Sequence, residues 1–422
     1  MTQFQSPKGM QDFYPEERAV QRAIFDSLSK TARAFAFQEV EPPVVESLSL
    51  LTAKSGEEIK QQIFVLEKKG TEELALRPEF TPGFARMFVA KQRELVKPVK
   101  WFTIGKAWRY EAPQKGRARE FFQLNAELYG SDKPEADAEI ILLAIACLKN
   151  IGLKETDFVV RINNRKLLGG LISSVISEDK IEAAMRLIDK SSKLTEQEFE
   201  LEAGKEEFTK QQTSELKKIS RLKGTPSKII NDLEKMNLTP QAQAGLQEIK
   251  TLVKLLPNKS VQLDISIARG FAYYTGMVFE IADSSSKLRA ICGGGRYDSL
   301  IEIYGGPKTP AVGFGMGDKT LTLFLEDKGL LPKTFTGPDY FVANISAETQ
   351  NYAQKTAAKL REKYSVEIDL MQRKLGKQLE YADSIKAKNV IFVGEDEVKS
   401  GLLKIKNMTT GKEEKKKVEE II

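Results

Sequence analysis

Residues 101–129, with the sequence WFTIGKAWRYEAPQKGRAREFFQLNAELY, decide the fold of this chain. We interpret them as two strands joined by a cationic loop. Because side chains alternate between the two faces of a strand, the second strand has an apolar face and a polar face that carries a carboxylate. The polar face holds Phe121, Gln123, Asn125, Glu127 and Tyr129. The stretch predicts a hairpin able to hold an anion at its tip and a polar ligand on its floor; a solvated sheet face with an ordinary basic turn is the alternative.

The bulk composition is that of a globular protein. A length of 422 residues suggests roughly three domains. The longest apolar run, residues 140–148, is too short to span a bilayer, and the N-terminal residues lack the pattern of a signal peptide. We therefore expect a cytoplasmic protein without a membrane partner. The formal charge of +6 permits a polyanionic partner without requiring one.

The absence of histidine restricts the chemistry of this chain. It excludes histidine general bases, triads that contain histidine, and metals ligated by histidine. Only two cysteines occur, Cys147 and Cys292, so a disulfide framework and a cysteine-based zinc site are not supported. Catalysis must rest on carboxylates, arginines, lysines, tyrosines or a hard metal ion bound by oxygen, and we assign no metal ligands.

The segment before the hairpin combines helices with an edge strand. Apolar positions at helical spacing predict a helix over residues 16–37. Pro42 and Pro43 exclude a central strand in residues 38–46, which we place at a sheet edge or an interface. Residues 63–66 and 73–76 then predict a short hairpin, followed by a turn into a helix that holds Pro82 in its first turn.

A helical insertion interrupts the domain that contains the hairpin. The pattern predicts a helix at residues 134–150 and a strand at 158–162. Residues 169–255 are rich in Lys, Glu, Ser and Gln and have helical periodicity, whereas strand patterns return at 261–267 and 272–281. We therefore divide the chain into residues 1–168 and 256–330 as one domain, 169–255 as an insertion, 331–338 as a linker and 339–422 as a last domain.

The last domain alternates strands with helices. Strands are predicted at 340–345, 366–370, 390–393 and 402–405, with helices at 347–363 and 377–387. This order is typical of a small α/β domain with a mixed, mostly parallel sheet. The lysine run at residues 415–417 is interpreted as solvated surface.

Two glycine clusters are candidates for close contact with a ligand. CGGGRYDSL at 292–300 and AVGFGMGD at 311–318 match neither a Walker A loop nor GxGxxG, so bound ATP would not use a P-loop. Glycine alternating with bulky residues is typical of a strand approached closely by a flat ligand or by another backbone. In RGFAYYTGMVFE, residues 269–280, Arg269 beside Tyr273 and Tyr274 predicts an anion site walled by aromatic rings.

Together these segments resemble the histidyl-tRNA synthetases, a family of class II aminoacyl-tRNA synthetases, along nearly the whole chain. PKGMQDFYPEE resembles the family's opening; FQEVEPPVVE, WRYEAPQKGRAREFFQLNAELYG and GFGMGD resemble the three class II motifs in order. RPEFT and RGFAYYTG resemble stretches specific to the histidine enzymes, and the domain after Pro338 resembles their anticodon-binding domain. The resemblance implies an α+β catalytic domain with an antiparallel sheet flanked by helices, and a homodimer joined through the Pro43 segment.

The implied activity is ATP-dependent ligation of L-histidine to tRNA(His) through a histidyl-adenylate, with release of pyrophosphate and then AMP. The resemblance also implies Mg²⁺ with the ATP. It assigns histidine binding to Glu79, Thr81, Gln123, Glu127, Tyr273 and Tyr274, ATP binding to Arg109, Glu111, Arg117 and Arg119, and catalysis to Arg109 and Arg269. These assignments agree with the chemistry, because a carboxylate ionised at pH 7 needs no general base, and arginines bring two anions together and stabilise the charge that develops.

The chain departs from the family pattern at two places. The third motif usually carries an arginine where this chain has Thr320, after Asp318 and Lys319. An aspartate that often precedes the tyrosine pair is replaced by Ala272.

Three other interpretations remain open. One is a catalytically silent relative such as the synthetase-like regulatory subunit of ATP phosphoribosyltransferase, which lacks the last domain. The others are a sister class II enzyme for Gly, Pro or Thr, and an RNA-binding scaffold. Histidine-dependent exchange of pyrophosphate into ATP separates all of them from the enzymatic interpretation.

Overall fold

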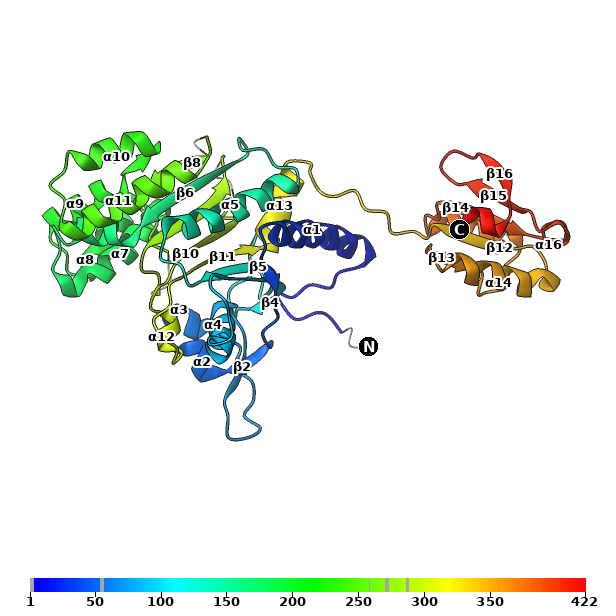
Figure 1. Ribbon diagram of the computed structural model, residues 1–422, viewed down its shortest axis with the longest axis horizontal. Helices are drawn as coiled ribbons and strands as arrows, with labels where there is room; N and C mark the ends of the chain where they lie inside the picture. Colours follow the sequence, from blue (N-terminus) through cyan, green and yellow to red (C-terminus); the bar gives the residue numbers. More distant parts are fainter. Residues whose placement is uncertain (1–3, 54–56, 258, 270–272, 286–287) are drawn as a thin grey trace. The chain divides into compact units, whose positions relative to one another are not determined.

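The computed structural model describes residues 4–53, 57–257, 259–269, 273–285 and 288–422. The chain divides into two compact units, one made of Met1–Asp12 and Gln21–Pro332 and the other of Phe13–Val20 and Lys333–Ile422. Within the described ranges, no helix combines the length and apolar character needed to cross a membrane. Each unit is built on its own sheet (Figure 1).

The first unit is organised around a nine-stranded sheet in the order β1-β4-β5-β11-β10-β9-β6-β8-β7. Neighbours are antiparallel except in the pairs β1/β4 and β6/β8. The strands, in sheet order, are β1 Gln38–Glu39, β4 Val99–Trp108, β5 Glu120–Tyr129, β11 Ala311–Gly317, β10 Cys292–Arg296, β9 Met277–Asp283, β6 Phe158–Asn164, β8 Val261–Asp264 and β7 Lys223–Gly224. The predicted antiparallel sheet of the first domain is confirmed.

The hairpin predicted at residues 101–129 is β4–β5, which lies between β1 and β11 in this sheet. Its register pairs Trp101 with Glu127 and Gly105 with Gln123. On its other side β5 pairs with β11, so that Gly313 faces Glu127. The proline-rich segment after the first helix is an edge, as predicted, because β1 pairs only with β4 at the end of the sheet order.

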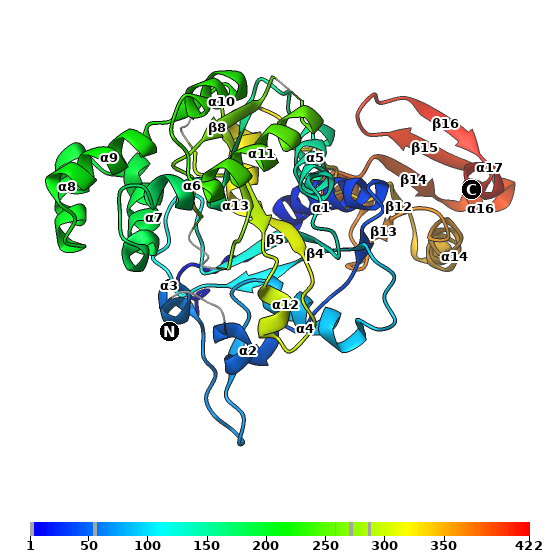
Figure 2. The same ribbon diagram turned by 60° about the vertical axis from the view of Figure 1, so that its left-hand side comes forward.

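Helices cover both faces of the sheet. The helices α5 (Pro134–Asn150) and α13 (Asp318–Asp327) pack against β5 and its neighbours. On the face that carries Trp101 and Tyr129, the helices α4 (Thr81–Lys91) and α12 (Leu300–Ile303) enclose a core rich in aromatic rings. The helix α1 (Pro15–Ala34) lies beside α5 in both ribbon views (Figures 1 and 2).

The predicted hairpin at residues 63–66 and 73–76 forms only in part. The strand β3 (Leu74–Leu76) pairs with β2 (Val45–Ser47), and residues 63–66 contribute a single bridge, Val65 to Ala75. Proline-rich chain between β1 and β2 therefore leads into a small sheet of its own. The helices α2 (Leu48–Thr52) and α3 (Glu57–Gln62) lie between β2 and residues 63–66 in the chain. The helix α4 holds Pro82 in its first turn, as predicted.

The helical insertion lies at one end of the large sheet (Figure 2). Its helices are α6 Arg165–Ile172, α7 Ile181–Lys190, α8 Glu196–Lys205, α9 Lys210–Ser220, α10 Pro226–Glu234 and α11 Pro240–Leu255, with short 3-10 turns at Glu178–Lys180 and Ser191–Lys193. The first of these helices follows β6 directly, because Asn164 accepts a hydrogen bond from the Lys166 N–H and so caps α6. A Cβ on Gly170 would stand 2.5 Å from the Ala242 nitrogen, so α6 and α11 pack backbone to backbone.

The second strand predicted after the insertion is shorter than expected. The strand β9 begins at Met277 rather than at residue 272, which lies outside the described residues. The strand predicted at 261–267 ends at Asp264. Cys147 and Cys292 are buried and unpaired, as expected of small core side chains.

The second unit is a mixed five-stranded sheet in the order β13-β12-β14-β15-β16. Two pairings are parallel and two antiparallel. The strands are β12 Tyr340–Asn344, β13 Val366–Ile368, β14 Asn389–Val393, β15 Leu403–Asn407 and β16 Glu413–Lys416, and the helices are α14 Gln350–Leu360, α15 Leu375–Ser384, α16 Glu395–Ser400 and α17 Val418–Ile421. A 3-10 turn, Ala347–Thr349, precedes α14. The lysine run predicted as surface is largely exposed; Lys415 and Lys416 form the end of β16, and Lys417 precedes α17.

Candidate active site

A cavity on the aromatic face of the large sheet gathers most of the predicted site residues. Glu79, Thr81, Arg109, Gln123, Arg269, Tyr273 and Tyr274 all line it. The remaining wall consists of Asn125, Gly293, Tyr297, Gly313, Phe314 and Gly315. Segments as far apart in sequence as Glu79 and Gly315 therefore meet where β5, β11 and β10 lie side by side.

The glycines of β10 and β11 make room for the polar side chains. A Cβ on Gly315 would collide with the Gln123 amide, and a Cβ on Gly293 would collide with the guanidinium of Arg269. Gly294 has a different role, because a Cβ there would collide with the backbone of β11. Close approach of another backbone is therefore confirmed at Gly294, whereas close approach of a flat ligand stays a prediction.

Glu127 lies beneath the floor of the cavity and is 1% exposed. Its Oε1 accepts hydrogen bonds from the Thr81 hydroxyl at 2.6 Å and from the Asn125 amide at 2.9 Å, and its Oε2 accepts one from Tyr129. Burial raises the pKa of Glu127, and these donors oppose that shift. Because the Thr81 proton points at Glu127, the lone pairs of the Thr81 oxygen are left to accept a hydrogen bond from a ligand.

Glu79 is the carboxylate that lines the cavity itself. The Tyr273 hydroxyl donates to Glu79 Oε2 at 3.1 Å, and the side chain is almost fully buried. Burial raises the pKa of Glu79 to about 7, against the opposing effect of Arg109. A cationic ligand bound next to Glu79 would restore its charge, so the site suits an ammonium group.

Two arginines provide positive charge at the same cavity. Arg109 donates from Nε to the Pro78 carbonyl at 3.0 Å, and its guanidinium lies 5.3 Å from the Phe121 ring centroid. Arg269 donates from Nη1 to Glu280 at 2.6 Å, while its buried Nε has no hydrogen-bond partner among the described residues. A guanidinium with a donor left over in a buried site is suited to binding an anion.

The basic loop between β4 and β5 lies beside the cavity. Arg117 forms an ion pair of 2.8 Å with Glu111, and the guanidinium of Arg119 stacks 3.9 Å from the Tyr110 ring centroid. Of the described residues that line the cavity, none is Glu111, Arg117 or Arg119. Three of the four predicted ATP residues therefore form a separate charged group outside the cavity, whereas the fourth, Arg109, lines it.

The third-motif region leaves this charged group without its usual arginine. A Cβ on Gly116 in the basic loop would stand 3.4 Å from the Thr320 hydroxyl, so the uncharged Thr320 lies under the loop tip. Lys319 donates to Gln11 at 2.8 Å. A different cation is present at the loop, because Arg289 donates to Gln114 at 2.9 Å. Burial and the neighbouring Arg117 lower the pKa of Arg289, as expected for two cations held close together.

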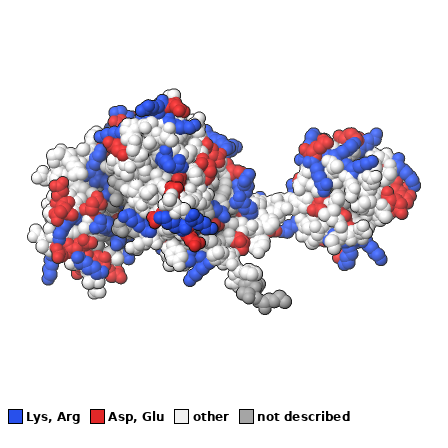
Figure 3. All heavy atoms as spheres, turned by 90° about the horizontal axis from the view of Figure 1, so that it is seen from below, with Lys and Arg blue, Asp and Glu red and all other residues white. Residues whose placement is uncertain are grey.

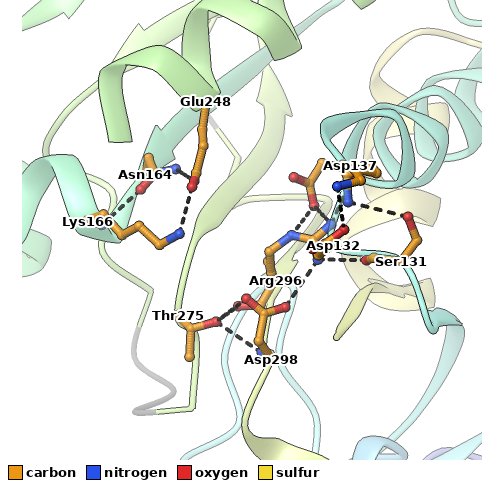
Figure 4. Close-up of polar contacts among 10 residues, drawn as sticks. Ser131, Asp132, Asp137, Asn164, Lys166, Glu248, Thr275, Arg296 and Asp298 are labelled. Carbon is orange, nitrogen blue, oxygen red and sulfur yellow. Dashed lines mark hydrogen bonds and ion pairs between the residues drawn. The ribbon is translucent and has the colours of Figure 1, made fainter. Parts of the chain in front are cut away.

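A buried polar network supports the wall that carries the tyrosine pair (Figure 4). Arg296, at the end of β10, donates from Nε to Asp137 at 2.9 Å and from Nη1 to Asp298 at 3.1 Å. The Arg296 carbonyl accepts the backbone N–H of Thr275 at 2.8 Å, and the Thr275 hydroxyl accepts the Asp298 N–H at 3.0 Å. The residue that follows Tyr274 is thereby fixed to α5 through Arg296.

Sequence reasoning missed Tyr297, Arg289 and the Arg296 network. Tyr297 lies inside a quoted glycine cluster, where its position after GGGR was a usable signal. Arg289 lies in a loop 175 residues from Gln114, and no local pattern links the two. Ala272, where the chain departs from the family pattern, lies outside the described residues.

Comparisons with known proteins place the chain among one family. A family model described as histidyl-tRNA synthetase matches residues 9–321, and one described as anticodon binding domain matches residues 339–422. Curated proteins named histidine–tRNA ligase are 38% identical in Natronomonas pharaonis over 96% of this chain and 94% of that protein. The corresponding Pyrococcus horikoshii protein is 39% identical over 98% of this chain and 97% of its own length.

Solved structures agree with this result. The crystal structure of histidyl-tRNA synthetase from Nostoc sp. has a TM-score of 0.83 at 26% identity and covers 100% of this chain and 99% of that one. A Bacillus halodurans structure described as an ATP phosphoribosyltransferase regulatory subunit/histidyl-tRNA synthetase has a TM-score of 0.76 at 24% identity, covering 93% of this chain and 98% of that chain. At that identity the second likeness bears on the fold alone.

Proposed function

This chain belongs to the histidyl-tRNA synthetase family, enzymes that ligate histidine to tRNA, and we propose that it does so through a histidyl-adenylate formed between Arg109 and Arg269. In the first step, a carboxylate oxygen of L-histidine attacks the α-phosphorus of ATP and pyrophosphate leaves. In the second step, a hydroxyl of the terminal ribose of tRNA(His) attacks the carbonyl carbon and AMP leaves.

The observation that carries the proposal is the arrangement of opposite charges around one cavity. Glu79 lines the cavity as a partner for the α-ammonium group, and Arg109 and Arg269 line the same cavity as partners for the carboxylate and the α-phosphate. Two anions must approach each other in this reaction, and fixed guanidinium groups stabilise the charge that grows in the transition state. The carboxylate is already ionised, so the absence of histidine side chains is no obstacle.

We assign recognition of the imidazole to the floor of the cavity. Thr81 offers an acceptor whose orientation is fixed by Glu127, and Gln123 and Tyr274 lie on the adjoining wall. Direct contact between Glu127 and the ligand requires that one of the hydrogen bonds from Thr81, Asn125 and Tyr129 to Glu127 breaks. A pocket that hydrogen-bonds the polar groups of its substrate rejects analogues that lack them by roughly 10⁴–10⁵-fold, so no editing site is needed.

We assign the distal phosphates of ATP to the charged group beside the cavity. Arg117 and Arg289 supply the positive charge there, and Arg289 takes the role that Thr320 is unable to fill. Arg119, stacked on Tyr110, holds the loop in place. The nucleotide substrate is the Mg²⁺ complex of ATP, and Glu111, which pairs with Arg117, belongs to the same charged group.

The tRNA partner is assigned to the basic loop, the helical insertion and the second unit. The match of residues 339–422 to an anticodon binding domain supports the last of these. Lysines and arginines are interspersed with acidic side chains on the face seen in Figure 3, so binding depends on local clusters rather than on a uniformly basic surface. The affinity should fall with rising salt through counterion release.

We further propose that two chains pair through residues 38–47. The support is that β1 is a sheet edge and that Val44 and Val45 beside it are 39% and 38% exposed. Sedimentation velocity of the wild type should give a dimer, and a Val44→Lys, Val45→Lys variant should give a monomer. A monomeric wild type would remove this part of the proposal.

Exchange of labelled pyrophosphate into ATP, measured with the purified chain and Mg²⁺, tests the activity directly. We expect exchange with histidine and none with glycine, proline or threonine. A folded protein that gives no exchange with any amino acid would support a silent regulatory or RNA-binding role. Exchange with another amino acid alone would support a sister class II enzyme.

A further inference from the structure

The backbone at Arg269 adopts a conformation that side-chain-bearing residues rarely take. Its φ of 60° lies in the left-handed region, which costs an ordinary residue free energy unless its surroundings hold it there. Two consecutive N–H groups, those of Ala268 and Arg269, both donate to Oδ1 of Asp189 at 2.9 Å. One carboxylate oxygen of the insertion helix α7 therefore fixes the peptide that carries the proposed catalytic arginine.

The carbonyl of this peptide is held by Arg165 of α6, which in turn pairs with Glu182 of α7. Arg165 donates from Nη1 to the Ala268 carbonyl at 3.0 Å and from Nη2 to Glu182 at 2.9 Å. Glu182 and Asp189 are seven residues apart on α7, so they lie two turns apart on one helical face. The turn at residues 268–269 is thus held in two ways. Asp189 accepts hydrogen bonds from its N–H groups, and Arg165, paired with Glu182, donates to its carbonyl.

The side chain of Arg269 points away from this clamp into the substrate cavity. Its partner Glu280 lines a second cavity, which lies between the insertion and the sheet and which Asp189, Ile267 and Lys193 also line. The ion pair of Arg269 and Glu280 is therefore shared by the walls of the two cavities. Asp189 both contacts the Arg269 segment and lines this second cavity, which we call the outer cavity.

We propose that Asp189 is a positioning residue that sets the guanidinium of Arg269 for the adenylation step, so that the helical insertion is part of the catalytic apparatus. The inference rests on the proposed function. Without the Asp189 carboxylate, two N–H groups lose their acceptor and the left-handed turn loses its support. A displacement of about 1 Å at a reacting group is enough to lower a rate by roughly 10²-fold.

The test compares Asp189→Ala with Asp189→Asn in pyrophosphate exchange. Asparagine keeps the Oδ1 acceptor, so we expect most of the wild-type rate with Asp189→Asn and a kcat lowered about 10²-fold with Asp189→Ala. The KM values for histidine and ATP should change less than about threefold, because Arg269 acts mainly in the transition state. Glu196→Gln is the matched control, since Glu196 lines the same outer cavity but pairs with Arg221, and it should leave the rate unchanged.

A double variant decides whether Asp189 acts through Arg269. In an Arg269→Ala background, the additional Asp189→Ala change should lower kcat no further. Independent, multiplicative losses in the double variant would overturn the inference while leaving the histidine-dependent activity of the wild type intact. A wild type without exchange would instead overturn the proposed function.

Hydrogen exchange supplies a readout that needs no activity. In a peptide spanning residues 265–269, followed by mass spectrometry, Asp189→Ala should speed exchange of the two clamped amides more than tenfold, and Glu196→Gln should not. Unchanged protection in Asp189→Ala would refute the clamp itself. If the alanine variant fails to fold, the exchange rate and kcat of Asp189→Asn decide: retention of both supports the inference, and a loss of kcat with full amide protection opposes it.

Discussion

Replacing Glu79 with glutamine should stabilise the unliganded protein at neutral pH and abolish its activity. Burial raises the pKa of Glu79 from an ordinary value of 4.5 to about 7. Below pH 4.5 the group is protonated in both folded and unfolded chains and has no effect. Between pH 4.5 and 7 the unfolded chain releases its proton first, so the free energy of unfolding falls as pH rises, by about 3 kcal/mol in all. Glutamine resembles the neutral form of Glu79, so the variant does not lose this part of its free energy of unfolding as pH rises.

Tryptophan fluorescence provides a suitable assay. Both tryptophans of the chain, Trp101 and Trp108, lie in β4, so their emission follows unfolding of the first unit alone. Urea unfolding of wild type and Glu79→Gln at pH 5 and pH 8 gives two stability differences. The other titrating groups contribute equally to both proteins, so their effect cancels in the difference between the two free energies of unfolding. From pH 5 to pH 8 this difference should change in favour of the variant by most of the roughly 3 kcal/mol expected from the shifted pKa. A difference that does not change with pH would show that Glu79 is ionised throughout and would refute the reasoning.

The remaining predictions concern the ligands. Histidine should bind the wild type more tightly as pH rises through about 7, because only ionised Glu79 pairs with the ammonium group, and Glu79→Gln should lose that part of the calorimetric pH profile; an unchanged profile would contradict the assignment. Gly293→Ala should lower the kcat of exchange about 10²-fold by displacing Arg269, with little loss of stability of the first unit. Gly376→Ala, in open space on α15 of the second unit, should leave kcat unchanged, and a normal kcat in Gly293→Ala would oppose the role of Arg269. Arg289→Ala should raise the KM for ATP about tenfold and leave the KM for histidine unchanged, and an unaltered ATP dependence would remove Arg289 from the nucleotide site. Glu127→Gln should lower kcat/KM for histidine about 10²-fold or more without weakening ATP binding measured by calorimetry, and unchanged histidine kinetics would exclude Glu127 from recognition.

The elements predicted correctly are those whose signal is local. The alternation of β5 is complete within ten residues, and α5 has the predicted bounds because an apolar helical pattern starts at a proline and ends at a polar residue. The strand β16 was missed because Glu413–Lys416 contains only charged residues and so lacks an apolar alternation. The pairing of β3 with β2 was missed because residues 63–66 are nearer in sequence, and proximity along the chain was the available guide.

The site was predictable as a set of residue types but not as a geometry. The family motifs name Glu79 and Tyr273, yet their hydrogen bond joins residues 194 positions apart and depends on the order of strands in the sheet. Glu127 lies below the floor of the cavity, where Thr81 and Asn125 donate hydrogen bonds to it. No spacing in the sequence predicts these two contacts. Asp189 has the sequence appearance of an ordinary acidic residue near a helix end, and only the fold brings it to the Arg269 backbone.

The parallel pairing of β6 with β8 predicts where relatives of this chain differ in length. Parallel neighbours need a connection that runs back along the sheet, and α11, packed tightly on α6, already provides it. The helices between α6 and α11 exceed what the topology requires. Differences in chain length accumulated during evolution should therefore concentrate between Ser191 and Thr239, while α6, α11 and the helix α7 that carries Asp189 are retained.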